Sequence, residues 1–123
     1  MGRMDYLPQQ ELIAYGWDGK HKKPASQMRS ALYHPRPQKS KLHPTQKPIG
    51  LLRKLIRNVT KVDDVVFDGF LGSGSTALAC EQLGRRCVGI EQDAEYVEIA
   101  LKRLEKLTGQ KRKLVTNYEH TPQ

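Results

Sequence analysis

A run of glycines between two acidic residues is the part of the sequence best suited to binding a ligand. Gly69, Gly72 and Gly74 follow an apolar run that ends at Asp68, and a helical pattern begins directly after them. Glycines at such a place let the backbone approach a ligand closely, and the start of a helix offers free amide groups. A second apolar run ends at Glu91, whose carboxylate can accept hydrogen bonds from ligand hydroxyls. These residue types predict a pocket for a small polar molecule.

Three kinds of ligand are compatible with this glycine loop. A nucleotide phosphate would require a lysine where Ser75 stands, although Thr76 fits the hydroxyl position of a phosphate-binding loop. A dinucleotide fits the spacing of two glycines and Ala77, with Glu91 placed to hold a ribose, but it leaves Asp68 unexplained. S-adenosylmethionine would lay its methionine part on the open loop and its ribose hydroxyls on Glu91, in charge-assisted bonds of about 1.5–3 kcal/mol each. A loop that only turns the chain is the alternative to all three.

The residues around the loop are patterned as a βαβ unit preceded by a helix. Apolar residues recur at helical spacing after Pro48, and short β-branched runs on either side of the next helix are typical of buried parallel strands. The expected elements are helices over 48–60, 75–83 (ended by Gly84) and 93–109 (capped by Asp93 and ended by Gly109), and strands over 65–67 and 87–90. Two strands are too few for a complete sheet. We therefore predict an α/β protein with a partial Rossmann-like fold, an incomplete sheet and exposed apolar surface at its edge.

Charge divides the chain into three segments. The 123 residues carry a formal net charge of +8, which favours a polyanionic partner, with nucleic acid as the first candidate. We predict a basic strand and loop segment over 1–42, with its strand at 11–16, a ligand-binding unit over 43–109, and a basic tail over 110–123. The candidates for phosphate contacts are Lys20, Lys22, Lys23, Arg29, Lys39 and Lys41. A solvated loop without a partner is the alternative for this region.

The composition also argues against several other classes of protein. The apolar runs are far shorter than the roughly 20 residues that span a bilayer, and the first ten residues lack the apolar core of a signal peptide. We therefore expect a cytoplasmic protein. Cys80 and Cys87 lack the spacing of a metal site or a disulfide framework, so we expect two small buried apolar groups and no metal.

Three motifs resemble those of the DNA N6-adenine and N4-cytosine methyltransferases. Residues 68–76, DGFLGSGST, resemble the family's Asp-Pro-Phe-x-Gly-Ser-Gly-Thr-Thr motif, and residues 43–48, HPTQKP, look like the motif that precedes it. Residues 89–96, GIEQDAEY, look like the acidic-strand motif that follows. Residues 12–17 and the basic stretch after them are similar to the strand and loop upstream in phage and restriction-type members. This order of motifs is that of the β class. The resemblance implies S-adenosylmethionine as cofactor and double-stranded DNA as substrate.

The resemblance also implies roles for individual residues. Thr45 and Lys47 would lie near the methionine end of the cofactor, the glycine loop beneath it, and Glu91 at the ribose. The implied cofactor-binding set is Thr45, Lys47, Asp68, Gly69, Phe70, Gly72, Ser73, Gly74, Thr76, Glu91 and Gln92. Gly69 departs from the family pattern, which has proline there, and this departure is expected to loosen the turn.

The motif that transfers the methyl group in this family is absent from the sequence. That motif, Asp/Asn-Pro-Pro-aromatic, holds and stacks the target base, whereas no Pro-Pro pair occurs in these 123 residues. In the β class it lies N-terminal to the motifs found here. We therefore expect no catalytic residue in this chain, which would be inactive alone and would need a separate catalytic segment. Because the sheet edge is incomplete, we also expect a homodimer or a complementary subunit. A non-catalytic DNA- or cofactor-binding remnant or regulator is the alternative.

Overall fold

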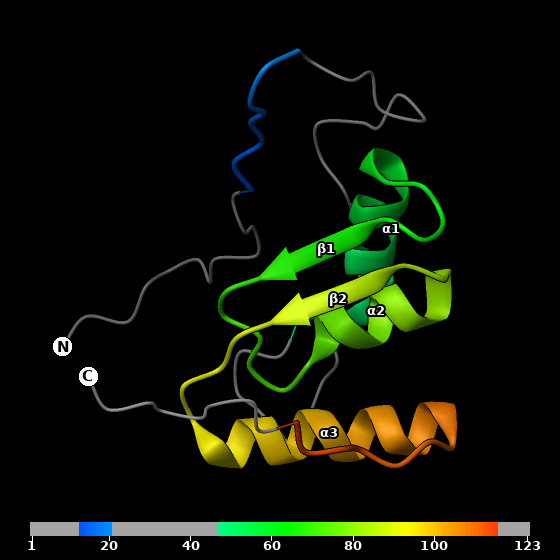
Figure 1. Ribbon diagram of the computed structural model, residues 1–123. Helices are drawn as coiled ribbons and strands as arrows, with labels where there is room; N and C mark the ends of the chain where they lie inside the picture. Colours follow the sequence, from blue (N-terminus) through cyan, green and yellow to red (C-terminus); the bar gives the residue numbers. More distant parts are fainter. Residues whose placement is uncertain (1–12, 21–46, 116–123) are drawn as a thin grey trace, which may run out of the picture.

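The computed structural model describes residues 13–20 and 47–115 and confirms a βαβ unit preceded by a helix. Figure 1 shows two strands side by side, with two helices behind them and a third running along one side. The elements in chain order are α1 (Ile49–Val59), β1 (Val65–Asp68), α2 (Ser75–Leu83), β2 (Arg86–Gly89) and α3 (Ala94–Thr108). The predicted α/β class and incomplete sheet are therefore correct, while the predicted segment boundaries at 42 and 109 remain predictions.

The two strands form a parallel pair whose carboxyl ends meet at one edge. Val65 is the register partner of Arg86, and Asp68 is the partner of Gly89. Just beyond the pair, the amide of Ile90 donates to the carbonyl of Asp68 at 2.9 Å. This register brings the acidic residue that ends β1 close to Glu91, two residues beyond β2.

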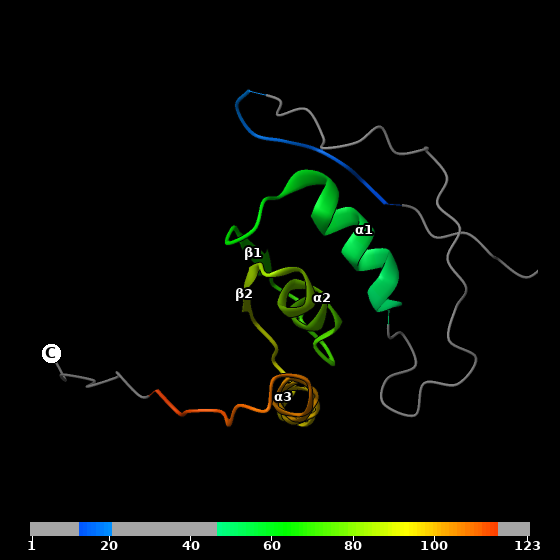
Figure 2. The same cartoon turned by 90° about the vertical axis from the view of Figure 1, so that its right-hand side faces the viewer.

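Helices α1 and α2 pack on one face of the sheet, and α3 packs on α2 (Figure 2). The core between sheet and helices centres on Ile56, Ala79 and Cys80, against which Cys87 is packed. Cys80 is fully buried and Cys87 partly so, and both thiols are free. Burial raises the pKa of Cys80 and raises that of Cys87 to about 11, so both stay protonated near neutral pH. Their predicted role as small apolar groups is confirmed for Cys80 and holds in part for Cys87.

The prediction that both strands are buried is wrong for one face of the sheet. Val65 and Phe67 on β1 are 60% and 65% exposed, and Val88 on β2 and Ile90 just after it are 54% and 58% exposed. Successive side chains of a strand point to opposite faces, and within residues 13–20 and 47–115 the helices pack on only one of them. These four residues are called the open sheet face below.

The strand predicted over residues 11–16 is also wrong for its described part. Residues 13–17 have no regular secondary structure and are exposed, although the rings of Tyr15 and Trp17 lie 6.0 Å apart. A strand needs hydrogen bonds to a neighbour, and the only strand pairing within the described ranges is that of β1 with β2.

The predicted end signals of α2 and α3 are confirmed, whereas the predicted start of α1 is not. Gly84 and Gly109 adopt left-handed conformations directly after α2 and α3, and the Asp93 carboxylate caps α3 by accepting from the amide of Glu95 at 2.9 Å. Pro48 was predicted to belong to the first turn of α1, but it is the extended N-cap of that helix. Helix α1 therefore begins one residue later than predicted, at Ile49.

Candidate functional site

A hollow of about 620 Å³ lies where the carboxyl ends of β1 and β2 meet the glycine loop and two helices. The starts of α1 and α3 complete its wall. The residues that line it are Lys47, Leu52, Asp68, Phe70, Leu71, Gly72, Ser73, Ser75, Thr76, Glu91 and Tyr96. Crevices beyond the carboxyl ends of parallel strands are common binding sites in open α/β sheets.

Local hydrogen bonds shape the first half of the glycine loop. The Asp68 carboxylate accepts from the amide of Phe70 at 2.9 Å, which closes a tight turn around Gly69. The ring of Phe70 is then left on the rim, where the residue is 95% exposed. Asp68 therefore fixes the backbone at the strand end while it presents negative charge to the hollow.

The second half of the loop requires glycine for two reasons. Gly74 has φ of +88°, in the left-handed region, where it forms the N-cap of α2. A Cβ at this position would also lie only 2.7 Å from the Cβ of Ala100 on α3. The loop is thus seated directly on α3.

Glu91 joins the glycine loop to the end of β2. Its carboxylate accepts from the amide of Gly72 at 3.2 Å, and the amide of Leu71 donates to the carbonyl of Ile90 at 2.9 Å. The side chain of Leu71 lies over Gly89, where a Cβ would come within 2.8 Å of it. The acidic side chain that we expected to hold a ligand is therefore also a support of the loop.

The structure brings together most of the predicted cofactor-binding residues. Those that line the hollow are Lys47, Asp68, Phe70, Gly72, Ser73, Thr76 and Glu91. Gly69 and Gly74 belong to the loop without lining the hollow, Gln92 is exposed beside it, and Thr45 lies outside the described residues. Their role in binding a ligand remains a prediction.

Sequence reasoning missed several residues of the site. Leu52, Leu71, Ser75 and Tyr96 line the hollow but were not in the predicted set. Arg103 was also missed, and it reaches the loop from α3. A signal for Arg103 existed, because it stands at helical spacing from Tyr96 and Ala100, where a charged residue interrupts an otherwise apolar stripe.

The guanidinium of Arg103 lies against the back of the glycine loop. Its Nη1 donates to the carbonyl oxygen of Ser73 at 2.8 Å and to the hydroxyl of Ser73 at 3.1 Å, with the hydroxyl of Ser75 at 3.4 Å. Both serines are buried. Burial lowers the pKa of Arg103, but a guanidinium stays charged at neutral pH.

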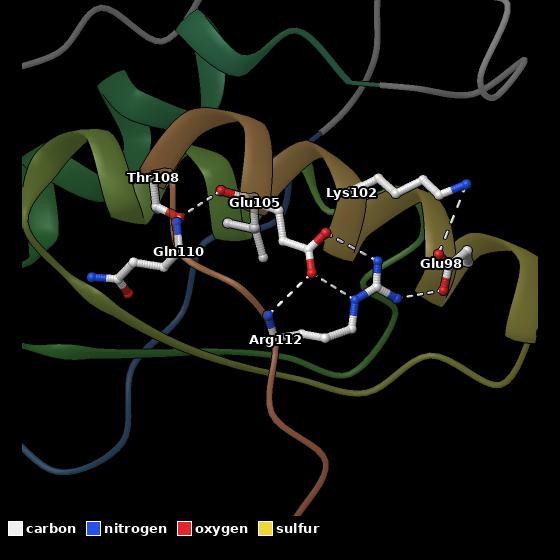
Figure 3. Close-up of polar contacts among 7 residues, drawn as sticks. Glu98, Lys102, Glu105, Thr108, Gln110 and Arg112 are labelled. Carbon is white, nitrogen blue, oxygen red and sulfur yellow. Dashed lines mark hydrogen bonds and ion pairs between the residues drawn. The ribbon is translucent and has the colours of Figure 1, made fainter.

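The predicted basic residues are mostly outside the described ranges. Lys20 is exposed, whereas Lys22, Lys23, Arg29, Lys39 and Lys41 lie outside them, so phosphate contact by this set remains a prediction. In the tail, Arg112 folds back onto α3 and pairs with Glu98 and Glu105 (Figure 3). The positive charge of Arg112 is thus paired with two carboxylates of α3.

Neither a metal cluster nor a membrane-spanning helix is found among the described residues. No group of three or more histidine, cysteine, aspartate or glutamate side chains there is placed to hold a metal ion. None of the helices in the same part of the chain is long and apolar enough to cross a membrane.

Chains similar to this one among the solved structures include two complexes with S-adenosylmethionine. The M1.HpyAVI–SAM complex shares 49% identity and a TM-score of 0.51 over 55% of this chain and 33% of that one. A putative DNA modification methylase from Thermus thermophilus, complexed with S-adenosyl-L-methionine, shares 33% identity and a TM-score of 0.51 over 56% of this chain and 29% of that one.

Comparison of sequences points to the same group of proteins. The type II methyltransferase M2.DpnII of Streptococcus pneumoniae is 51% identical over 51% of this chain, and M2.MboI of Moraxella bovis is 46% identical over 54% of it. The matched region covers 24% of each of these relatives. The model of the N6 and N4 DNA methylases matches residues 5–102, most of the chain. This chain therefore belongs to the DNA methylase family.

Proposed function

We propose that this chain supplies the S-adenosylmethionine-binding part of a DNA methyltransferase that modifies adenine N6 or cytosine N4 in double-stranded DNA. One observation carries the proposal: Glu91 and the glycine loop line the same hollow, and the Glu91 carboxylate accepts a hydrogen bond from the amide of Gly72. The similar chains solved with S-adenosylmethionine support the same ligand. The similar methyltransferases come from bacteria, so a DNA substrate would place this protein in the cytoplasm of a bacterial cell.

The chemistry of the hollow fits this ligand. Its volume of about 620 Å³ lies within the roughly 300–1,000 Å³ that small-molecule sites occupy. One oxygen of Glu91 accepts from Gly72, and the other has no hydrogen bond within the described residues, so it is available to accept from a ribose hydroxyl. Asp68 adds a second negative charge, which suits a cationic sulfonium ligand. When bound, S-adenosylmethionine supplies the methyl group.

The proposal includes a separate polypeptide that carries the catalytic motif. An exocyclic amine is a weak nucleophile, and its activation needs polar groups and an aromatic ring around an extruded base. The sequence contains no Pro-Pro pair, and the matched region covers about a quarter of the relatives' length. The open sheet face offers apolar surface on which a complementary segment can pack.

Calorimetric titration of S-adenosylmethionine into the purified chain tests the cofactor site. We expect Glu91→Gln to weaken binding by about ten- to a hundred-fold, because it removes the charge from one hydrogen-bond acceptor while keeping its shape. Glu81→Gln is the matched control, since Glu81 is exposed on α2 away from the hollow. A folded wild-type chain that binds no S-adenosylmethionine would refute the cofactor assignment.

Transfer of labelled methyl groups to DNA separates this proposal from a second candidate function. We expect transfer only when a polypeptide with a Pro-Pro-aromatic motif is added. A chain that binds DNA or cofactor but never supports transfer with such a partner would instead be a non-catalytic binding protein, an alternative favoured by the missing Pro-Pro pair.

A further inference from the structure

We propose that Arg103 is a positioning residue for ligand binding. It fixes the conformation of the glycine loop by hydrogen bonds from α3, on the side of the loop that faces away from the hollow. The nature of the ligand rests on the proposed function above, whereas the effect of Arg103 on the loop does not. The residue touches the loop and not the hollow, so its influence on a ligand must pass through the two serines.

The contacts of Arg103 converge on one short segment of the loop. A single nitrogen, Nη1, lies 2.8 Å and 3.1 Å from two oxygens of Ser73 and 3.4 Å from the hydroxyl of Ser75. Both serines are buried and both line the hollow. Because their oxygens accept from Arg103, each hydroxyl hydrogen remains able to donate elsewhere.

Packing on α3 supports the loop beside this contact. Ala100 lies on the same side of α3 as Arg103, three residues earlier, and is only 2% exposed. It sits against Gly74 so closely that a Cβ there would meet it at 2.7 Å. The helix therefore supports the loop at two adjacent points, one apolar and one polar.

A purely structural role and a positioning role for Arg103 predict different effects of one substitution. All three acceptors of Arg103 are uncharged oxygens, and no ion pair to a carboxylate is recorded for it among the described residues. Methionine keeps the length and packing of the side chain but leaves the buried oxygens of Ser73 and Ser75 without this donor. The cost of Arg103→Met should therefore fall on the glycine loop more than on the core around Ile56, Ala79 and Cys80.

The first experiment compares ligand binding by Arg103→Met, Arg103→Lys and the matched control Lys106→Met. Lys106 is an exposed basic residue on the same helix. At a temperature where circular dichroism shows every variant folded, calorimetry should give a dissociation constant for S-adenosylmethionine about ten-fold higher in Arg103→Met. Arg103→Lys should fall between this variant and the wild type, because lysine keeps the charge and a donor but not the planar guanidinium that places Nη1 against the loop.

The second experiment follows the loop without any ligand, by amide hydrogen exchange. We expect faster exchange at residues 72–76 in Arg103→Met and unchanged exchange in α1. Unchanged exchange at the loop would overturn the proposal, and so would equal acceleration in α1, which would mark a general loss of stability. If Arg103→Met does not fold, Arg103→Lys carries the same comparison. A wild-type chain that binds no ligand, together with faster loop exchange in the variant, would refute the proposed function and leave the role of Arg103 standing.

Discussion

Gly72 and Gly74 both have positive φ angles, 58° and 88°, but only Gly74 is enclosed by neighbouring atoms. A Cβ on Gly72 would meet no atom within 4 Å, whereas one on Gly74 would overlap Ala100. The positive φ of Gly72 is therefore a matter of backbone conformation alone. At Gly74 conformation and space act together, and the attachment of the loop to α3 depends on both.

Gly74→Ala is expected to destabilise the protein strongly. Overpacking against Ala100 costs about 1–3 kcal/mol, and the left-handed conformation of a residue with a Cβ adds about 1 kcal/mol. Gly109→Ala is the matched control, because Gly109 has φ of +71° and open space around it, so only the second cost applies. Urea denaturation measures the free energy of unfolding of both variants. Equal losses would show that Ala100 moves aside without cost.

Gly69→Pro is expected to stabilise the protein by about 0.4–1 kcal/mol. Gly69 has no positive φ, no hydrogen bond is recorded for its amide within the described residues, and the strand residue before it is extended, as proline requires. Proline would then reduce the entropy of the unfolded chain. The thermal midpoint reports the effect, with Gly16→Pro, in the exposed segment 13–20, as a control outside the site. A fall in the midpoint would mean that the turn has a φ that proline cannot adopt.

The glycine loop could be predicted from sequence because its constraints are local. Glycines between a strand and a helix, bounded by Asp68 and Glu91, indicate a binding loop through the order of residue types alone. Arg103 could not be predicted as a site residue, because its acceptor Ser73 lies thirty residues earlier in the sequence. The packing of α3 on α2 is what brings the two residues together. Leu52 could not be predicted for a similar reason, since α1 reaches the hollow only through its packing on α2.

The boundaries of helices and strands could be predicted where neighbouring residues determine them, and could not be predicted where distant residues do. The ends of α2 and α3 were predictable because Gly84, Gly109 and Asp93 act on the residues beside them. Strand formation at 11–16 was not predictable from its apolar residues, because a strand also depends on a partner elsewhere in the chain. The exposure of one sheet face likewise depends on which layers are present and not on the strand sequence.

Helix α3 holds the start of the basic tail by a cluster of charges that should respond to acid. The side chain and backbone amide of Arg112 both donate to Glu105, which lowers the pKa of that carboxyl to about 2 from an ordinary 4.5. Glu98 also pairs with Arg112, and its pKa is lowered as well. A lowered folded-state pKa contributes stability that is complete above the unfolded value and disappears as the pH falls through the folded value.

The start of the tail, at Arg112, is therefore expected to stay on α3 at neutral pH and to detach as the pH falls from about 4.5 towards 2. The backbone amide and Nε–H resonances of Arg112 would follow this change by nuclear magnetic resonance. Glu98→Gln/Glu105→Gln is the control, because it removes both titrating partners and should abolish the transition. The groups are exposed, so added salt should weaken the attachment. Arg112 resonances that do not change with pH in the wild type would contradict attachment of Arg112 through Glu98 and Glu105.

At the scale of the whole molecule, the open sheet face is the main departure from an ordinary α/β layer arrangement. Parallel sheets are normally covered by helices on both faces, whereas here Val65, Phe67, Val88 and Ile90 are more than half exposed. Water contact with such apolar side chains is unfavourable by roughly 1.5–3 kcal/mol for each one that could be buried. In the absence of a complementary polypeptide, a second copy of the chain offers the same apolar surface.

We therefore expect the purified chain to self-associate through the open sheet face, with a weight-average mass that rises with concentration in sedimentation velocity. Phe67→Thr/Val88→Thr should raise the dissociation constant by at least about ten-fold, because it removes apolar area while keeping residues that favour strands. Val115→Thr is the control, since Val115 is 75% exposed in the tail. Addition of a true catalytic partner should displace the second copy, because both would bury the same residues. A wild-type chain that stays monomeric at high concentration would show that this face alone does not drive association.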